Sequence, residues 1–315
     1  MAKLRVGVLM GGRSSEHEVS LNSARSVIDG LDPQRYEVVS FEIPREGPWH
    51  LPADQAQGID VVFPVLHGPF GEDGAVQGVL ELAEVAYVGA GVTASGLCMD
   101  KDLFKSVMRD KGIPVARSLT LRAGNEPASP FGFPCVVKPA RLGSSVGISV
   151  VRSERDFLPA VKLALAHDEK ILVEEFVEGV EVECSVLGNA DPVASMPGEI
   201  VPLASDWYDY EAKYADGGME LVVPPRVSAK STARVQELAV ASFVASDCEG
   251  MARVDFFVRP GGEVVVNELN TIPGFTATSV YAKLFEASGL PYPELLDRLV
   301  ELALERRDRR AALRY

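Results

Sequence analysis

The segment MARVDFFVRPGGEVVVNELN, residues 251–270, constrains the fold of this chain more tightly than any other stretch. Two β-type runs flank Gly261-Gly262, and a Gly-Gly pair between such runs predicts a two-residue hairpin turn. That turn places Asp255 directly opposite Glu268 on the neighbouring strand. Because side chains alternate across a strand, the polar residues of the hairpin are expected to share one face. They are Arg253, Asp255, Glu268 and Asn270.

Two carboxylates and one amide oxygen at the end of adjacent strands form a cluster of hard oxygen donors, which suits Mg²⁺ better than zinc. The alternative is an exposed face held by cross-strand ion pairs. The continuation TIPGFTATS, residues 271–279, favours the metal because it places a loop of glycine and hydroxyl residues directly beyond the cluster. The predicted ligands are Asp255, Glu268 and Asn270.

The rest of the sequence predicts an α/β (α+β) chain of three domains. Residues 1–100 alternate short apolar runs with helical patterns, which is typical of a parallel sheet with helices on its faces. Residues 101–190 hold a helix and then β-rich runs, two of them on either side of a turn at Glu178-Gly179. Residues 191–315 contain a long polar loop, a helix, the hairpin and a final helix.

Composition excludes several classes of partner. A net charge of −14 disfavours binding to nucleic acid or to anionic lipid, and no apolar run approaches the ~20 residues that span a bilayer. The arginines between 306 and 314 suit the solvated end of a helix better than a nucleic-acid-binding tail. Scattered cysteines predict reduced, buried thiols in a cytoplasmic protein. They are Cys98, Cys135, Cys184 and Cys248.

The turn GGRSSEHEVS, residues 11–20, follows an apolar strand and opens a helix. Such a turn often holds a phosphate, but Glu16 and Glu18 would repel an anion here. It also lacks the G-x-G-x-x-G pattern of a dinucleotide-binding dehydrogenase. Ser15 and Glu18 have the spacing of a capping box, which would use the second glutamate to satisfy the free amides of the helix.

Three further features carry chemistry only in combination. The loop GSSVG, residues 143–147, follows Lys138 and could wrap phosphate oxygens with its amides, although an ordinary hairpin turn explains it equally well. It is not a Walker A loop, since no Gly-Lys-Ser/Thr follows. The strand end at 174–177 suits an adenine edge, with Glu181 near the ribose, or is simply an acidic edge strand. His67 ends an apolar strand, where either a structural or a functional role fits.

In this order, the motifs GGRSSEHEVSLNSA, LHGPFGEDG, KPARLGSSVGI, YDYEAKY, RVDFF and NELNTIPGFTATS resemble the D-alanine–D-alanine ligase family of the ATP-grasp superfamily. The resemblance runs from residue 4 to about 285. It implies a three-domain ATP-grasp architecture in which ATP is held between two antiparallel-sheet domains, with a lid loop at 205–220. The implied enzyme phosphorylates one D-alanine on its carboxylate and lets the amine of a second attack, giving D-Ala-D-Ala for peptidoglycan precursors. A cytoplasmic homodimer is implied as well.

The same resemblance assigns the nucleotide and metal contacts. Two Mg²⁺ ions, or Mn²⁺ in their place, are implied at Asp255, Glu268 and Asn270, the ligands already expected from the hairpin. The residues implied to bind ATP are Lys101, Lys138, Ser144, Ser145, Glu174, Glu175, Phe176, Val177, Glu181 and Lys213.

The resemblance also assigns the amino-acid site. Glu16 is implied to bind the ammonium group of the first D-alanine and to form a chain with Ser144 and Tyr214 that latches the lid loop. His67 is implied to lie near the first carboxylate. The groups implied to stabilise the oxyanion are Arg253 and the Gly274 amide, and those implied to bind the second carboxylate are Ser279 and Val280.

Two alternatives to this function remain at the level of sequence. One is another ATP-grasp carboxylate–amine ligase, or a D-Ala–D-lactate ligase, with a different acceptor. Tyr214 favours the dipeptide over the ester, because family members that make the ester depart from this loop. The other is a nucleotide-binding regulatory protein without turnover, which the presence of the metal, phosphate and lid residues argues against.

Overall fold

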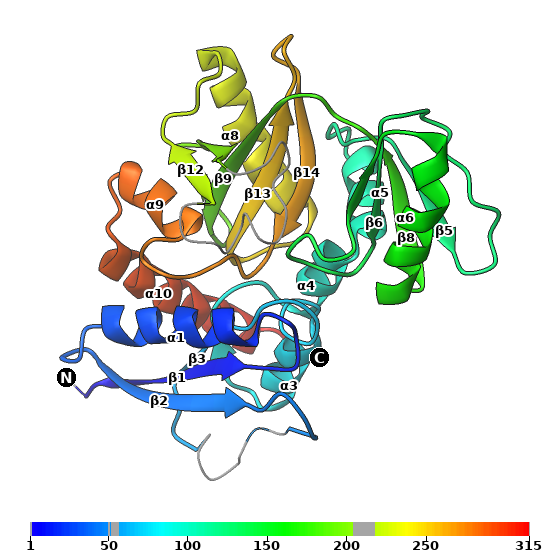
Figure 1. Ribbon diagram of the computed structural model, residues 1–315. Helices are drawn as coiled ribbons and strands as arrows, with labels where there is room; N and C mark the ends of the chain where they lie inside the picture. Colours follow the sequence, from blue (N-terminus) through cyan, green and yellow to red (C-terminus); the bar gives the residue numbers. More distant parts are fainter. Residues whose placement is uncertain (1, 50, 52–56, 204–217, 315) are drawn as a thin grey trace.

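A computed structural model describes residues 2–49, 51, 57–203 and 218–314. Figure 1 shows a parallel sheet at one side of the molecule and two antiparallel sheets at the other, with α4 between them and α5 beside β6. The predictions for Lys213, Tyr214 and most of the 205–220 loop fall outside the described residues.

The first sheet is parallel throughout, as the alternating pattern predicted, and has the order β2-β1-β3-β4. Alternate residues of β1 serve two cores: Val6 and Val8 pack towards α1 and α10, whereas Leu9 packs towards α3. Its elements are β1 (Leu4–Gly11), α1 (His17–Gly30), β2 (Tyr36–Ile43), β3 (Val61–Pro64), α3 (Ala75–Leu82), β4 (Ala86–Tyr87) and α4 (Val92–Met99).

The second sheet is antiparallel, has the order β5-β8-β6-β7, and packs against α6. Helix α5 joins it to the rest of the chain and is capped by Asp100, whose side chain accepts the amides of Asp102 and Leu103. The elements are α5 (Lys101–Asp110), β5 (Ser118–Arg122), β6 (Cys135–Pro139), β7 (Ser149–Val151), α6 (Glu154–His167) and β8 (Lys170–Glu175).

The third sheet is also antiparallel, with the order β12-β11-β9-β13-β14 and β10 paired to β9. One face packs on α8, and the loop after β14 leads into two helices that return to the parallel sheet (Figure 1). The elements are β9 (Val180–Gly188), β10 (Val193–Ala194), β11 (Gly198–Pro202), β12 (Met219–Val222), α8 (Ala229–Ala245), β13 (Gly250–Val258), β14 (Val264–Asn270), α9 (Val280–Ala287) and α10 (Tyr292–Ala311).

Strands β8 and β9 are consecutive in sequence but belong to different sheets. Residues 176–179 therefore cross from one antiparallel sheet to the other, and the two sheets face each other across this segment. The domain ranges 1–100, 101–190 and 191–315 stay a prediction. The chain passes from the second sheet to the third at residues 176–179, before the predicted boundary at residue 190.

The turn of the β13–β14 hairpin differs from the two-residue prediction. The loop runs from Pro260 to Gly262, and a 2.9 Å hydrogen bond from the Arg259 amide to the Glu263 carbonyl closes it. Gly262 has φ 83°, the left-handed conformation that ends a three-residue hairpin loop. Pro260 precedes the two glycines and takes the first position of the turn, so the loop is one residue longer than Gly-Gly alone suggests.

A β-bulge between the turn and the site shifts the pairing register of β13 and β14 by one residue. Pairing slips by one residue between Asp255 and Phe256, which leaves Asn267 of β14 without a partner in β13. Beyond the bulge Asp255 pairs with Glu268, and Arg253 pairs with Asn270, as predicted. The predicted turn was wrong, but the predicted facing of the polar residues is confirmed.

The basic C-terminal segment is not simply a solvated helix end. Arg306 is buried, donates to the carbonyl oxygens of Tyr87 and Gly89, and places its guanidinium 4.1 Å from the centroid of the Tyr87 ring. Arg310 reaches Glu81 on α3. The expectation of solvation was wrong for Arg306, because this residue continues the apolar face of α10 and fastens that helix to the parallel sheet.

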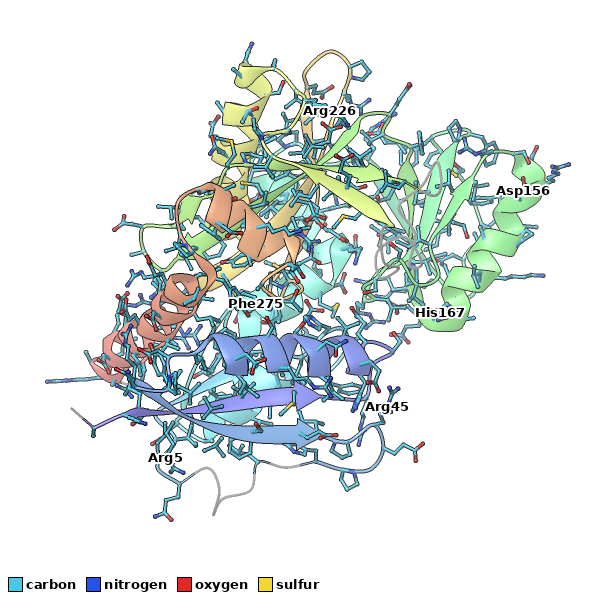
Figure 2. All side chains as sticks on the ribbon, turned by 60° about the vertical axis from the view of Figure 1, so that its left-hand side comes forward. Arg5, Arg45, Asp156, His167, Arg226 and Phe275 are labelled. Carbon is cyan, nitrogen blue, oxygen red and sulfur yellow. The ribbon has the colours of Figure 1, made fainter. Side chains whose placement is uncertain are left out.

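Phe275 ties the loop after β14 to both parts of the molecule (Figure 2). Its ring lies 5.5 Å from the rings of Phe63 and Tyr281 and 5.9 Å from that of Tyr292, measured between centroids. Since Phe275 is fully buried, these contacts hold the neighbouring Gly274 in place.

All four cysteines are buried free thiols, as predicted. Within the described ranges, no helix has the length and apolar character needed to cross a membrane.

Candidate active site

The first part of the candidate site is a cavity between the two antiparallel sheets. Its apolar walls come from both sides, Val136 on β6 and Phe257 on β13. The structure places nine of the predicted ATP-binding residues around it; Lys213 is the tenth and lies outside the described residues. The nine are Lys101, Lys138, Ser144, Ser145, Glu174, Glu175, Phe176, Val177 and Glu181.

A row of buried charges lies along one wall of this cavity. One carboxylate oxygen of Glu174 lies 2.9 Å from Lys138 Nζ, and the other lies 3.2 Å from Lys105 Nζ. The two lysines hold the pKa of Glu174 below its usual value despite its burial. Sequence analysis missed Lys105, although it lies four residues after Lys101 and so on the same face of α5.

The bulged residue of β14 reaches the same lysine. Asn267 Oδ1 accepts from Lys138 Nζ at 3.3 Å, which links one sheet to the other across the cavity. A bulge commonly redirects a side chain towards a site, but neither the extra residue nor the bulge is visible in the sequence pattern. Lys101 makes a second link, to the Leu142 carbonyl at 2.8 Å and to Glu268 at 3.3 Å.

The loop 143–147 joins this cavity to a second one. Ser144 and Ser145 have positive φ, 52° and 58°, a conformation that is uncommon for non-glycine residues and often found at functional sites. The Ser144 hydroxyl donates to Glu16, so the loop contacts the turn that precedes α1. Of the predicted chain Glu16–Ser144–Tyr214, the first link is therefore present, and the second lies outside the described residues.

The second cavity has a volume of about 600 Å³ and lies between α1, the end of β3, β13–β14 and the loop after β14. Gly143, Ser144 and Glu268 line both cavities, so the two meet there. The structure brings together all the residues predicted for the amino-acid substrates and the oxyanion: Glu16, His67, Arg253, Gly274, Ser279 and Val280.

The two glutamates of the opening turn point to different places. Helix α1 begins at His17, and Glu16 occupies the position before it without a side-chain capping bond. Ser14 Oγ accepts the Glu16 amide at 3.2 Å, and Glu18 pairs instead with Arg45 at 2.8 Å on the surface. The predicted Ser15–Glu18 capping box was wrong, but Glu16 is buried and faces the cavity.

His67 is a buried neutral group that connects three segments. Its ring nitrogens lie 3.3 Å from Ser23 Oγ of α1 and 3.2 Å from the Ile272 carbonyl. Burial lowers the pKa of His67, and Glu16 only partly opposes this effect. It can therefore donate one hydrogen bond and accept another, but it carries no charge for a carboxylate.

Two of the predicted metal ligands, Asp255 and Asn270, form a connected group with Arg253, and the third, Glu268, pairs with Lys101. Arg253 binds both carboxylate oxygens of Asp255, at 2.7 and 2.8 Å, and Asn270 Nδ2 donates to Asp255 at 2.9 Å. Glu183 lies 2.8 Å from Arg253 Nε, the same nitrogen that contacts Asp255. Two carboxylates and one amide oxygen remain a donor set that fits Mg²⁺, although no three His, Cys, Asp or Glu side chains within the described ranges form a metal-binding group.

Glu72 is a further residue that sequence analysis missed, within the predicted LHGPFGEDG loop. It lines the second cavity, and one carboxylate oxygen accepts the Gly68 amide at 2.6 Å. Burial, together with the negative charge of Glu16, raises the pKa of Glu72 to about 8. Glu72 is thus mainly a neutral acid at pH 7, which leaves Glu16 as the charged carboxylate on this side of the cavity.

Glu72→Gln is expected to flatten the pH dependence of stability. The pKa of Glu72 is 4.5 in the unfolded chain and about 8 in the folded protein. Between these two pH values, Glu72 holds a proton in the folded protein that it has lost in the unfolded chain. The free energy of unfolding should therefore fall as pH rises through this window, by at most about 1.4 kcal/mol per unit, and level off above pH 8. Urea unfolding of both proteins at pH 5, 6.5 and 8 measures this, and parallel curves would show that Glu72 does not titrate there.

A parallel-sheet unit is joined to two antiparallel sheets, and these enclose a cavity to which Lys101 and Lys138 contribute; this arrangement defines an ATP-grasp fold. The buried carboxylate of Glu16 in the adjoining cavity is suited to a small ammonium compound. Residues 107–301 match the family described as D-ala D-ala ligase C-terminus, and residues 5–59 and 50–90 match D-ala D-ala ligase N-terminus. The chain belongs to the D-alanine–D-alanine ligase family.

Three relatives illustrate the similarity. The D-alanine–D-alanine ligase of Solibacter usitatus is 47% identical, over 99% of both chains. The VanG D-Ala:D-Ser ligase of Enterococcus faecalis matches in structure with a TM-score of 0.86 and 35% identity, over 96% of this chain and 100% of that one. A D-alanine–D-alanine ligase of Bacillus anthracis, complexed with ATP, matches with a TM-score of 0.83 and 29% identity, over 98% and 99%.

Proposed function

We propose that the chain is a D-alanine–D-alanine ligase: it joins two D-alanines with ATP through a D-alanyl phosphate and releases ADP and phosphate. The observation that carries the proposal is the meeting of the two cavities at Ser144 and Glu268. A phosphate group held in the first cavity would there lie next to a carboxylate held in the second. Such a reaction needs mainly positioning and charge neutralisation.

The nucleotide half of the mechanism uses the cleft between the antiparallel sheets. Adenine would lie between the apolar walls near 174–177, with Glu181 on the ribose, and Lys101 and Lys138 would neutralise phosphate charge. Lys213 is proposed for the γ-phosphate. Two Mg²⁺ ions, or Mn²⁺, held by Asp255, Glu268 and Asn270, would supply further neutralisation of the polyphosphate.

The amino-acid half uses the second cavity. Glu16 would hold the ammonium group of the first D-alanine, with neutral His67 beside its carboxylate. Arg253 and the Gly274 amide would stabilise the oxyanion that forms when the second amine attacks. The groups proposed for the second carboxylate are Ser279 and Val280, and Tyr214 is proposed to latch the lid over Ser144, which excludes water from the acyl phosphate.

A second candidate is a ligase that accepts a different second substrate, as the likeness to a D-Ala:D-Ser ligase suggests. Purified protein with ATP and D-alanine alone should release phosphate and form D-Ala-D-Ala. D-serine or D-lactate added with D-alanine tests the acceptor, because a preference for the mixed product would favour this candidate. Nucleotide binding without phosphate release would instead indicate the regulatory protein. We propose in addition a cytoplasmic homodimer that supplies peptidoglycan precursors.

A further inference from the structure

Lys105 lies behind the nucleotide cavity. Its side chain has no exposed surface, and its Nζ is 3.2 Å from Glu174 Oε1. The other oxygen of Glu174 is 2.9 Å from Lys138 Nζ. Glu174 and Lys138 are among the described residues that line the cavity, and Lys105 is not. A bound nucleotide would therefore contact Lys138 and Glu174 first and would not reach Lys105.

The order of charges along this row is positive, negative, positive. A buried carboxylate with a single cationic partner neutralises the charge of that partner, because no water is available to replace the contact between them. Glu174 with Lys138 alone would be a neutral pair, and the cavity wall would offer little attraction to an anion. With Lys105 behind Glu174, the row keeps a net positive charge at its cavity end.

The state of Lys105 agrees with this arrangement. Burial lowers the pKa of Lys105 to about 8, and the carboxylates of Glu174 and Glu268 oppose that effect while Lys138 adds to it. Lys105 therefore remains mainly charged near pH 7. Its position on α5 fixes Glu174 from the side opposite the cavity.

We propose that Lys105 is a positioning residue for nucleotide binding: it neutralises Glu174 from behind and so leaves the charge of Lys138 available to the anionic nucleotide. The inference rests on the proposed function, since it takes this cavity to be the ATP site. It gives a role to a lysine that none of the sequence motifs marks.

The test measures ADP binding to the full chain by calorimetry with MgCl₂ present, and the KM values for ATP and D-alanine. Lys105→Met should raise the Kd for ADP and the KM for ATP at least ten-fold and leave the KM for D-alanine within two-fold. Unchanged ADP binding in Lys105→Met overturns the inference. Lys105→Gln carries the same expectation if the methionine variant does not fold.

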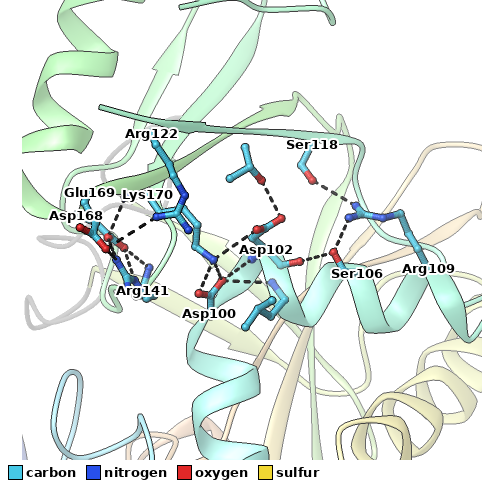
Figure 3. A network of polar contacts seen from close by, with 12 residues as sticks. Asp100, Asp102, Ser106, Arg109, Ser118, Arg122, Arg141, Asp168, Glu169 and Lys170 are labelled. Carbon is cyan, nitrogen blue, oxygen red and sulfur yellow. Dashed lines mark hydrogen bonds and ion pairs between the residues drawn. The ribbon is translucent and has the colours of Figure 1, made fainter. Parts of the chain in front are cut away.

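Lys170→Met is the matched control. Lys170 is also buried and also joins β8 to α5, through Asp100 at 2.6 Å and Asp102 at 3.4 Å (Figure 3). The Lys170→Met variant therefore loses a comparable ion pair between the same two elements, at the end of β8 away from Glu174. ADP affinity should stay within two-fold, and a loss as large as that of Lys105→Met would mean that only the α5–β8 packing matters.

The double variant Lys105→Met/Glu174→Gln separates the charge effect from packing. When Glu174 carries no charge, it no longer neutralises Lys138, and Lys105 is not required to compensate for it. The double variant should therefore bind ADP more tightly than Lys105→Met and within two-fold of Glu174→Gln. A loss that persists in the Gln background overturns the inference. Wild-type protein that binds ADP but forms no dipeptide would overturn the proposed function alone, and dipeptide formation with unchanged Lys105→Met affinity would overturn the inference alone.

Discussion

Glu268→Gln is expected to lower kcat roughly 100-fold to 1,000-fold, the range found when one group that stabilises developing charge is lost. Glu268 lines both cavities and contacts Lys101 at 3.3 Å. The variant keeps the size of the side chain but removes one of the two carboxylates proposed to hold Mg²⁺. The phosphates would then lose cationic neutralisation at the point where the two cavities meet.

The measurement is D-Ala-D-Ala formation over a range of MgCl₂ concentrations, together with Mn²⁺ binding by electron paramagnetic resonance in the presence of ADP. Glu268→Gln should bind Mn²⁺ at least ten-fold more weakly. Glu263→Gln is the matched control, because Glu263 immediately precedes the same strand, is largely exposed, and pairs only with Arg259 among the described residues. Equal Mn²⁺ binding by both variants would remove Glu268 from the metal site.

The β13–β14 hairpin shows what the sequence could and could not predict about this fold. Alternation of polar and apolar residues was sufficient to place Asp255 opposite Glu268, because burial of one face fixes which residues point to the other. The turn was predicted one residue too short, since Pro260 as well as both glycines enters the loop. The error did not reach the site because the bulge at Asn267 restores the register, and a bulge leaves no periodic signal of its own.

Ionisable groups inside the molecule were the hardest part to predict. Lys105, Glu72 and Arg306 resemble ordinary surface residues in composition, and their environments depend on partners that are distant in sequence. Helical spacing offered a partial signal for two of them. Lys105 lies one turn after Lys101, and Arg306 lies three residues after buried Ala303. Glu72 had no such signal, because its environment is formed by Glu16 and by the loop after β14.

Contacts between remote segments explain the remaining differences. The spacing of Ser15 and Glu18 fits a capping box, but Arg45 from the loop after β2 holds Glu18 on the surface. Similarly, β8 and β9 are adjacent in sequence, yet they belong to different sheets, β8 between β5 and β6 and β9 between β11 and β13. Local patterns predicted the elements well, whereas the cleft between the sheets arises from pairings that no local pattern specifies.

Glu16→Gln is expected to lower kcat/KM for D-alanine about 100-fold, a loss of about 2.7 kcal/mol in transition-state stabilisation. Glutamine still accepts the hydrogen bond from Ser144, so the contact with the 143–147 loop is retained. What is lost is the negative charge at a buried position, where an ammonium group depends on it most. Nearby Glu72, mainly neutral at pH 7, cannot replace that charge.

Glu18→Gln provides the matched control from the same turn. Glu18 is exposed, and its pairing with Arg45 is a solvent-screened surface contact that contributes little to stability. Steady-state kinetics of both variants should show a large effect for Glu16 and less than a two-fold effect for Glu18, with ADP affinity unchanged in each. If Glu16→Gln bound ADP more weakly but kept its kcat/KM for D-alanine, the turn would belong to the nucleotide site. The expected result instead makes it a cation site, because the fold turns one glutamate inward to the substrate and the other outward to Arg45.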